Sequence, residues 1–237
     1  MKRSERRGPL EREARAVLRE AAASMRRLEP HAARAVAASA ETLIACLASG
    51  GTVYFCGNGG SAADAQHLAA ELAGRYFAER PALAAVALTT NTSSLTAIGN
   101  DYGYDRVFAR QLEGLGTPGD VLVAISTSGG SASVRSAIET AHQLGMTVIG
   151  MTGANGGSFA ALCDHALVTP HTSTPRIQEG HIAMGHAFCE LIERALFPAA
   201  PRSAGRPARA ARRGARRAAR RGARRTARRA RRRTRRS

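Results

Sequence analysis

Two turns rich in glycine and serine are the first candidates for chemistry in this chain. The first covers residues 57–61, GNGGS, and the second covers residues 126–131, STSGGS. Each turn follows an apolar run and precedes a segment with helical spacing. Backbone N–H groups in such a turn and the N-terminus of the next helix favour an anion, and serine hydroxyls add donors. Two such turns predict a phosphorylated ligand that is held from two sides.

A second group of candidates consists of imidazole, carboxylate and amide side chains on two predicted helices. His67 and Glu71 share a helix face directly after the first turn, and Gln178 and His186 lie on neighbouring parts of one surface of the last helix. Near a phosphate-binding turn, a histidine and a carboxylate on one helix turn, such as His67 and Glu71, can act as metal ligands or as an acid–base pair. On spacing alone, His67 with Glu71 also fits an ordinary surface pair, and His186 also fits a histidine of the core.

Asn100 and Asp101 form a third candidate pair, because they follow Gly99 at the end of a predicted helix. Asparagine and aspartate after glycine often terminate a helix or form a turn. At the end of a strand–helix unit they are also placed to meet sugar hydroxyls. The local sequence leaves both interpretations open.

The remaining sequence predicts the elements that position these groups. Five apolar runs predict strands at residues 52–56, 84–89, 121–125, 146–151 and 165–168. Helices are predicted at residues 61–76, 92–99, 103–115, 131–144, 157–162 and 176–197. Continuous apolar strands that alternate with helices are typical of a parallel sheet covered on both faces. Ligands bind such sheets beyond the carboxyl ends of the strands, where both turns lie.

The N-terminal part of the chain predicts two helices that are separated at Pro30. Apolar residues recur every three or four positions from Leu10 to Met25, and the second helix runs from about His31 to Ala48. Such helices either cover the sheet or form a subunit interface. The sequence therefore divides into a helical segment at 1–30, an α/β domain at 31–197 and a different segment at 198–237.

The positive charge of the chain belongs to this last segment. The chain has 35 basic and 18 acidic residues, and 18 arginines but no acidic residue lie beyond residue 197. Residues 1–197 are therefore close to neutral. The Ala-Arg-Arg repeats of 198–237 have no hydrophobic periodicity, so this tail is predicted to be disordered. Arginine-rich segments bind polyanions, so nucleic acid is a candidate partner of the tail alone; the other interpretation is that the tail is dispensable.

The cysteines and the hydropathy predict a cytoplasmic protein. The four cysteines lie in apolar stretches without a CxxC pair, which favours buried, reduced thiols. The N-terminus is charged and has no apolar segment of the kind found in secretory signals. No apolar run approaches the length of about 18 residues that a membrane span needs.

Four ordered motifs give the chain a family resemblance. Over about residues 31–197 the sequence contains GNGGSAADAQHLAAELAGRY, TAIGNDYGYDRVFARQ, GDVLVAISTSGGSASV and TPRIQEGHIAMGH. In this combination it closely resembles the phosphoheptose isomerases of the sugar-isomerase (SIS) domain superfamily. The resemblance implies an α/β three-layer sandwich around a five-stranded parallel sheet, assembled as a homotetramer with active sites between subunits. It also implies conversion of sedoheptulose 7-phosphate to D-glycero-D-manno-heptose 7-phosphate through an enediol, the first step of nucleotide-activated heptose biosynthesis.

The resemblance also assigns roles to individual residues. It implies one Zn²⁺ per subunit on His67, Glu71, Gln178 and His186, with Glu71 and His186 as the catalytic groups. The implied substrate contacts are Asn58, Gly59, Gly60, Ser61, Glu71, Arg75, Asn100, Asp101, Ser126, Thr127, Ser128, Ser131 and Gln178. Two alternatives remain at this point, namely a non-catalytic binding protein similar to the DnaA initiator-associating protein and a sugar-phosphate sensor. The presence of both Glu71 and His186 favours the enzyme.

Overall fold

The computed structural model describes residues 7–198, with the side chain of Arg7 excepted, and within them a five-stranded parallel sheet. The strand order is β2-β1-β3-β4-β5, and all four neighbouring pairs are parallel. The strands are β1 (Val53–Gly57), β2 (Ala85–Ala87), β3 (Val121–Ile125), β4 (Thr147–Gly153) and β5 (His165–Thr169). The predicted number of strands and their parallel arrangement are confirmed. The tail at residues 198–237, apart from Pro198 itself, lies outside the described residues, and so does its predicted disorder.

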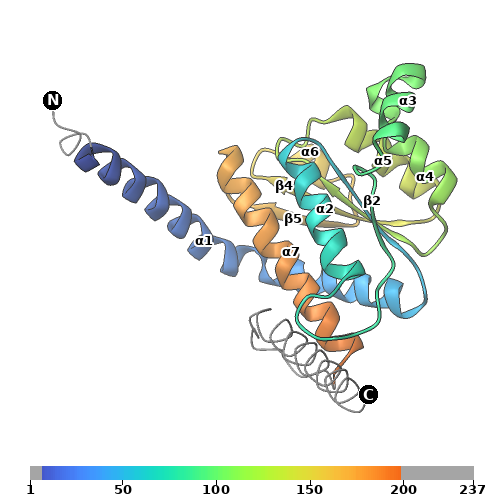
Figure 1. The fold of residues 1–237 in the computed structure, drawn as a ribbon, viewed down its shortest axis with the longest axis horizontal. Helices are drawn as coiled ribbons and strands as arrows, with labels where there is room; N and C mark the ends of the chain where they lie inside the picture. The colour runs from blue at the N-terminus through green and yellow to red at the C-terminus, as the bar shows by residue number, and fades with distance from the viewer. Residues whose placement is uncertain (1–6, 199–237) are drawn as a thin grey trace, which may run out of the picture. The chain divides into compact units, whose positions relative to one another are not determined.

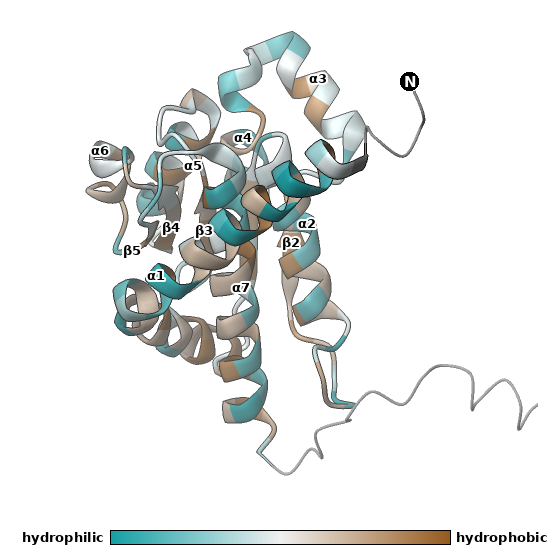
Figure 2. Cartoon of the chain, turned by 90° about the vertical axis from the view of Figure 1, so that its left-hand side faces the viewer, coloured by the Kyte–Doolittle hydropathy of each residue, from teal (hydrophilic) through white to brown (hydrophobic). Residues whose placement is uncertain are grey.

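Helices cover both faces of this sheet, which gives the predicted three-layer sandwich (Figure 1). The helices are α1 (Arg7–Ala48), α2 (Gly60–Ala73), α3 (Thr92–Tyr102), α4 (Ala109–Leu115), α5 (Ala132–Gln143), α6 (Gly157–Ala160) and α7 (Thr174–Leu196). Phe55 and Val123 point to the face covered by α1, α2 and α7, whereas Tyr54 and Leu122 point to the face covered by α4 and α5. Figure 2 shows hydrophobic and hydrophilic residues together on α2 and α7, as expected for helices with one face on a sheet.

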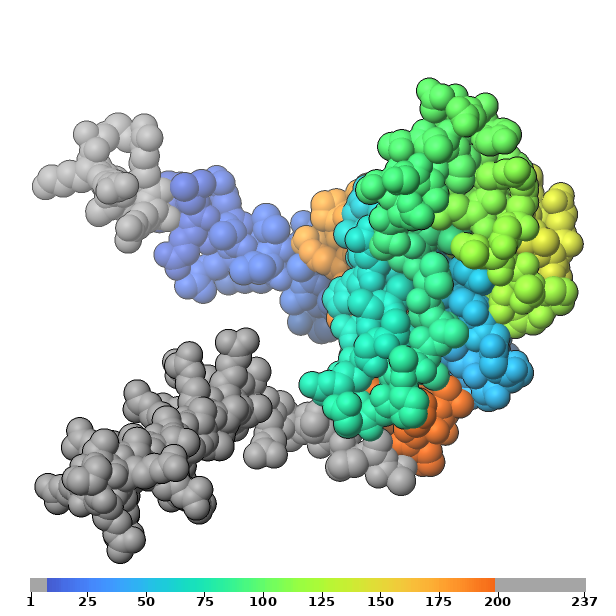
Figure 3. All heavy atoms as spheres, turned by 45° about the vertical axis from the view of Figure 1, so that its right-hand side comes forward, coloured from blue at the N-terminus to red at the C-terminus, as the bar shows by residue number. Residues whose placement is uncertain are grey.

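The N-terminal region differs from the sequence prediction, because α1 is one helix of 42 residues that continues through Pro30. A proline inside a helix leaves the carbonyl four residues earlier without its usual donor. Pro30 and Arg26 are both exposed, so water can satisfy that carbonyl, while Leu28 and Ala32 are buried on either side and hold the helix against the core. The predicted boundary between residues 1–30 and 31–197 therefore falls within a helix. The division into domains at this boundary stays a prediction. The first turns of α1 extend away from the other described residues (Figure 3).

The helix predicted at 103–115 is also wrong in detail. Its first part is a short 3₁₀ turn, η1 (Tyr104–Arg106), and α4 begins only at Ala109. Gly103 precedes the turn with φ +88°, a left-handed conformation that glycine adopts without strain and that ends α3. This change of direction brings Tyr104 toward the first glycine-rich turn.

The parallel register brings the two glycine- and serine-rich turns together, as predicted. Gly57 at the end of β1 pairs with Ile125 at the end of β3. The turns that follow these residues therefore leave the same edge of the sheet side by side, and α2 and α5 both begin there. Among the described residues, no helix is long and apolar enough to cross a membrane.

Candidate active site

The side-chain amide of Asn58 joins the two turns. Its Nδ2 donates to Ser131 Oγ at 2.7 Å and to Ser133 Oγ at 3.0 Å, and its Oδ1 accepts from the Tyr104 hydroxyl at 2.9 Å. The amide therefore uses both donors and one acceptor site within the protein. Ser133 and Tyr104 were not among the predicted site residues. Ser133 lies only two residues after Ser131, whereas nothing in the local sequence pointed to Tyr104.

Neither α2 nor α5, the helices that follow the two turns, has a side-chain cap. The N-cap residue of α2 is Gly59, which has no side chain to accept a bond. The N-cap residue of α5 is Ser131, whose side chain accepts no bond from the first turn of the helix. The Ser131 hydroxyl is bonded to Asn58 instead. In contrast, the Asn91 side chain caps α3 by accepting from Ser94 N at 3.0 Å. No side chain occupies the N-termini of α2 and α5, and their positive potential favours an anion, although Ser61 N and Ala62 N at the start of α2 already donate to the carbonyls of Asn58 and Gly59.

The predicted serines differ in how accessible they are. Ser61 and Ser126 are buried, Ser131 is half-buried, and Ser128 is exposed with its Oγ accepting from Gly130 N at 3.2 Å. Gly129 lies between them with φ +68°, and a Cβ there would be 2.7 Å from the Phe159 side chain. Glycine is therefore required at this point of the second turn. The half-buried Thr127 supports the turn because its carbonyl accepts from Gly153 N.

The structure brings His67, Glu71 and His186 together. His67 Nε2 lies 3.1 Å from Glu71 Oε1 and 3.4 Å from His186 Nε2, and one ligand atom from each residue lies within 4.8 Å of the others. The two imidazole rings meet edge to face, with centroids 5.0 Å apart. Three potential ligands from two helices thus point to one position at the surface of the described chain.

Close packing of α2 and α7 makes this approach possible. A Cβ on Gly185 would lie 2.5 Å from Leu68 Cδ2, so glycine before His186 lets α7 pack this closely against α2 without displacing the buried Leu68 side chain. A Cβ on Gly60 would lie 2.1 Å from Gln178 Nε2, so the same two helices also pack closely near the first turn. The Gln178 amide is therefore placed against the start of α2. About 10 Å of helix separates this level from His67.

Electrostatics near the cluster favour a neutral imidazole. Desolvation and the neighbouring His67 lower the pKa of His186, while Glu71 has the opposite effect. Neutral imidazole is the form that binds a metal ion or accepts a proton. Asp64 lies one turn before His67, and burial raises the pKa of its carboxyl group. Among the described residues, no donor reaches the buried Asp64 Oδ2.

The other predicted substrate contacts lie on α3 and after α2. Asn100 and Asp101 are exposed at the end of α3, four and three residues before Tyr104, and are bonded to each other at 2.8 Å. Arg75 is exposed after α2, where its Nη1 donates to the Phe77 carbonyl at 3.3 Å. Asp101 does not belong to the His67–Glu71–His186 cluster within one chain.

Comparisons with known proteins give the same family from sequence and from structure. The SIS domain family matches residues 17–153. The phosphoheptose isomerase of Rhodospirillum rubrum is 60% identical over 164 residues, which cover 69% of this chain and 87% of that protein. The phosphoheptose isomerase of Trichlorobacter lovleyi is 51% identical over 175 residues, covering 74% and 89%.

Solved structures show the same relationship. Phosphoheptose isomerase GmhA from Neisseria gonorrhoeae superimposes with a TM-score of 0.74 at 48% identity, covering 78% of this chain and 98% of that chain. A phosphoheptose isomerase from Francisella tularensis gives a TM-score of 0.74 at 36% identity, covering 77% and 97%.

Proposed function

Because the chain belongs to the phosphoheptose isomerases of the SIS-domain family, we propose that it converts sedoheptulose 7-phosphate to D-glycero-D-manno-heptose 7-phosphate. Membership of the family makes the chain an aldose–ketose isomerase that acts on a sugar phosphate. The observation that carries the proposal is the convergence of His67, Glu71 and His186 beside two uncapped helix N-termini. This arrangement offers one place for the phosphate and another for the reacting carbons.

The donor set fits a zinc ion, and we propose one ion per subunit. Two imidazole nitrogens and a carboxylate are common zinc ligands, and bonds of about 2.0–2.1 Å bring such atoms to roughly 3.3 Å from each other in a tetrahedron. The distances of 3.1 Å and 3.4 Å from His67 Nε2 are close to that value. Gln178 is the fourth proposed ligand by family resemblance, and its position against the first turn, about 10 Å along α2 from His67, also makes it a proposed substrate contact. When bound, zinc would polarise the substrate carbonyl as a Lewis acid.

We assign the proton transfers to Glu71 and His186. Glu71 takes the proton from the carbon next to the carbonyl, which gives an enediolate, and returns it to the neighbouring carbon. His186 moves a proton between the two oxygens. One proton thus moves between carbons and one between oxygens, and the ketose and the aldose differ only in the positions of these two protons.

We assign the phosphate to the edge where the two turns meet. Backbone N–H groups at the starts of α2 and α5 and the hydroxyls of Ser61, Ser126, Ser128 and Ser131 are the proposed donors, with Gly59, Gly60 and Thr127 in the same turns. The distance along α2 between Gly60 and His67 separates this anion site from the cluster, as the phosphate and carbonyl ends of the substrate are separated. Binding energy from the phosphate can then orient the reacting carbons. Asn58, Asn100 and Asp101 are proposed to contact hydroxyl groups at the rim, and Arg75, beyond the C-terminal end of α2, is a further proposed substrate contact.

We also propose that the chain assembles as a homotetramer. No residue of α3 is buried, and Leu10, Val17 and Leu18 of α1 are each more than half exposed within one chain. Helices with exposed apolar residues gain stability when a second copy covers them. Light scattering of the purified protein tests the tetramer.

A cytoplasmic location agrees with four free cysteines, since thiols stay reduced there. Binding of nucleic acid by the tail at residues 198–237 remains a prediction.

The reaction can be followed directly. The purified protein is mixed with sedoheptulose 7-phosphate, with and without a zinc chelator, and the sugar carbons are followed by NMR. We expect the aldose product to form, its rate to fall with chelation, and added zinc to restore the rate. Bound zinc without any product would contradict the proposed reaction and would favour a sugar-phosphate-binding protein.

A further inference from the structure

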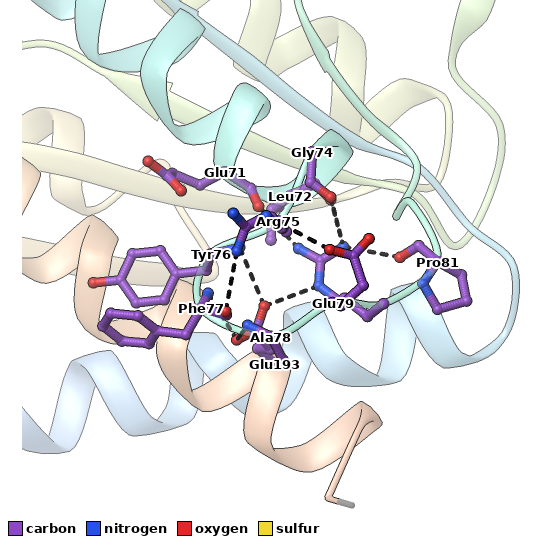
Figure 4. A network of polar contacts seen from close by, with 11 residues as sticks. Glu71, Leu72, Gly74, Arg75, Tyr76, Phe77, Ala78, Glu79, Pro81 and Glu193 are labelled. Atoms are coloured by element: carbon purple, nitrogen blue, oxygen red, sulfur yellow. Dashed lines mark hydrogen bonds and ion pairs between the residues drawn. The ribbon is translucent and has the colours of Figure 1, made fainter. Parts of the chain in front are cut away.

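A buried ion pair joins the end of α2 to α7 next to the cluster. Arg80 lies in the loop after α2, and its Nε is 3.1 Å from Glu193 Oε2 on α7; the two side chains are only 1% and 7% exposed. The Glu193 carboxylate also accepts three backbone N–H bonds, from Tyr76 at 3.1 Å, Phe77 at 2.9 Å and Ala78 at 2.8 Å. Figure 4 shows Glu193 below this loop with the bonds that hold it. One carboxylate on α7 therefore fixes three successive amides of the loop.

The other side of Arg80 closes the C-terminal end of α2. Its Nη2 donates to the Glu71 carbonyl at 2.9 Å, and its Nη1 donates to the Leu72 carbonyl at 2.9 Å and to the Gly74 carbonyl at 3.4 Å. The last carbonyls of a helix lack partners within the helix and carry negative potential, so a guanidinium is well suited to them. Arg80 thereby holds the backbone of Glu71 while Glu193 holds Arg80.

The loop held by Glu193 also touches the cluster. The Tyr76 ring lies against the His186 ring, with centroids 5.7 Å apart, and packs edge to face on Phe77. His186 and Glu193 are both on α7, two turns apart. The network thus reaches the cluster at two points, through the Glu71 backbone and through the ring that packs on His186.

We propose that Arg80 and Glu193 are positioning residues for the metal-binding cluster, and that they fix Glu71 on α2 in register with His186 on α7. This inference rests on the proposed function, because it assumes that the cluster holds zinc. A metal ion needs its ligands within a few tenths of an ångström, and the groups that orient the ligands contribute to affinity. Loss of either residue is therefore expected to weaken zinc binding and turnover, whereas the phosphate turns at the other end of α2 stay intact.

A purely structural ion pair gives a different result from a positioning pair. Removal of a structural pair lowers the melting temperature but leaves the folded protein with normal zinc affinity and normal kcat. Removal of a positioning pair changes zinc affinity and kcat in the folded protein, with little change in KM. The split between kcat and KM and the direct measurement of zinc affinity therefore distinguish the two.

The test uses Arg80→Lys and Glu193→Gln in the full chain. Lysine keeps the charge but lacks the planar fork that reaches Glu193 and the α2 carbonyls together. Arg194→Lys is the matched control, because Arg194 pairs with Glu190 on the exposed side of the same helix. We expect Arg80→Lys and Glu193→Gln to bind zinc about 10- to 100-fold more weakly in chelator competition, to lose kcat by a similar factor, and to keep KM within about twofold. Arg194→Lys should match the unaltered protein in all three.

Tyr76→Leu provides a milder second variant. It removes the ring from His186 but keeps the Tyr76 amide that Glu193 binds, so it should fold even where the other two do not. We expect weaker zinc binding here as well. Folded Arg80→Lys and Glu193→Gln proteins with unchanged zinc affinity and kcat would overturn the inference; if they do not fold, unchanged zinc affinity in Tyr76→Leu overturns it. Absence of zinc binding by the unaltered protein would instead overturn the proposed function.

Discussion

The two ends of α2 are built in opposite ways. At its N-terminal end Gly59 is the N-cap residue with φ +55°, and no side chain caps the helix. At its C-terminal end the Arg80 guanidinium binds the carbonyls of Glu71 and Leu72, and Glu193 binds Arg80. No side chain binds the backbone donors at one end, whereas a buried side chain satisfies the acceptors at the other.

In the proposed function, this difference separates binding from positioning within a single helix. The open end lies beside the second turn and can receive a phosphate through donors that no side chain occupies. The closed end carries His67 and Glu71 and keeps them at a fixed position relative to His186 on α7. Substitutions at the open end should therefore act on KM, and substitutions at the closed end on kcat, metal affinity and stability.

The largest effect is expected for Glu71→Gln at the closed end. The amide keeps the shape of the side chain but cannot take a proton, so kcat should fall by about 10²- to 10⁴-fold while the protein stays folded. Steady-state isomerase assays and circular dichroism measure the two properties. Glu139→Gln on the exposed side of α5 is the control and should behave like the unaltered protein. Normal turnover in Glu71→Gln would remove Glu71 from the reaction.

Glu193→Gln should have the next largest effect, on stability. Breaking a buried ion pair lowers the free energy of unfolding by about 3 kcal/mol, measured by urea denaturation at neutral pH. Although burial alone would raise the pKa of Glu193, the three backbone N–H groups and Arg80 hold that pKa below its ordinary value of 4.5. A lowered folded-state pKa gives stability above pH 4.5 that is lost as the pH falls through the folded-state value.

The difference between Glu193→Gln and the unaltered protein should therefore be largest at neutral pH and should shrink below pH 4.5. Arg194→Lys again serves as the control, since its exposed pair contributes about 0–1 kcal/mol. A difference in unfolding free energy that stays constant from neutral pH to pH 3 would contradict the assignment of an ionised, buried Glu193.

A smaller effect is expected at the open end. In the double variant Ser126→Ala/Ser128→Ala, the loss of donors to a charged phosphate should raise KM by roughly 10-fold and leave kcat nearly unchanged. Ser93→Ala on the exposed side of α3 is the matched control. If KM barely changes while kcat falls, the two ends of α2 do not divide their roles as described.

The smallest effect is expected from removal of residues 199–237. Every described residue assigned to the two ends of α2 lies between Asn58 and Glu193, so kcat and KM should stay within about twofold of those of the full chain. The same pair of proteins can be compared for binding to DNA at low and high salt. Loss of activity on truncation would mean that the tail takes part in the site.

The sequence was sufficient to predict the open end and the His67–Glu71 pair, but not the Arg80–Glu193 pair that satisfies the closed end. The two turns, the order of strands and helices, and the His67–Glu71 spacing depend on local patterns, and the register of β1 and β3 places the turns together as expected. Arg80 and Glu193 are 113 residues apart, and no local pattern links them. Their role becomes visible only when α7 is packed against the loop after α2.

Two errors in the helix predictions have a similar origin. Pro30 favours a break in local terms, but burial of Leu28 and Ala32 on either side holds α1 together. The predicted helix at 103–115 was interrupted because Gly103 turns the chain, which lets the Tyr104 hydroxyl reach Asn58. In both regions tertiary packing decided between local alternatives that the sequence left close in energy.

Anomalous X-ray scattering at the zinc absorption edge, from crystals of the zinc-loaded protein, tests the central claim most directly. We predict one zinc peak per subunit, within bonding distance of His67 Nε2, a Glu71 carboxylate oxygen and His186 Nε2. A zinc peak away from these three atoms, or none at all in protein that is active, would contradict the account.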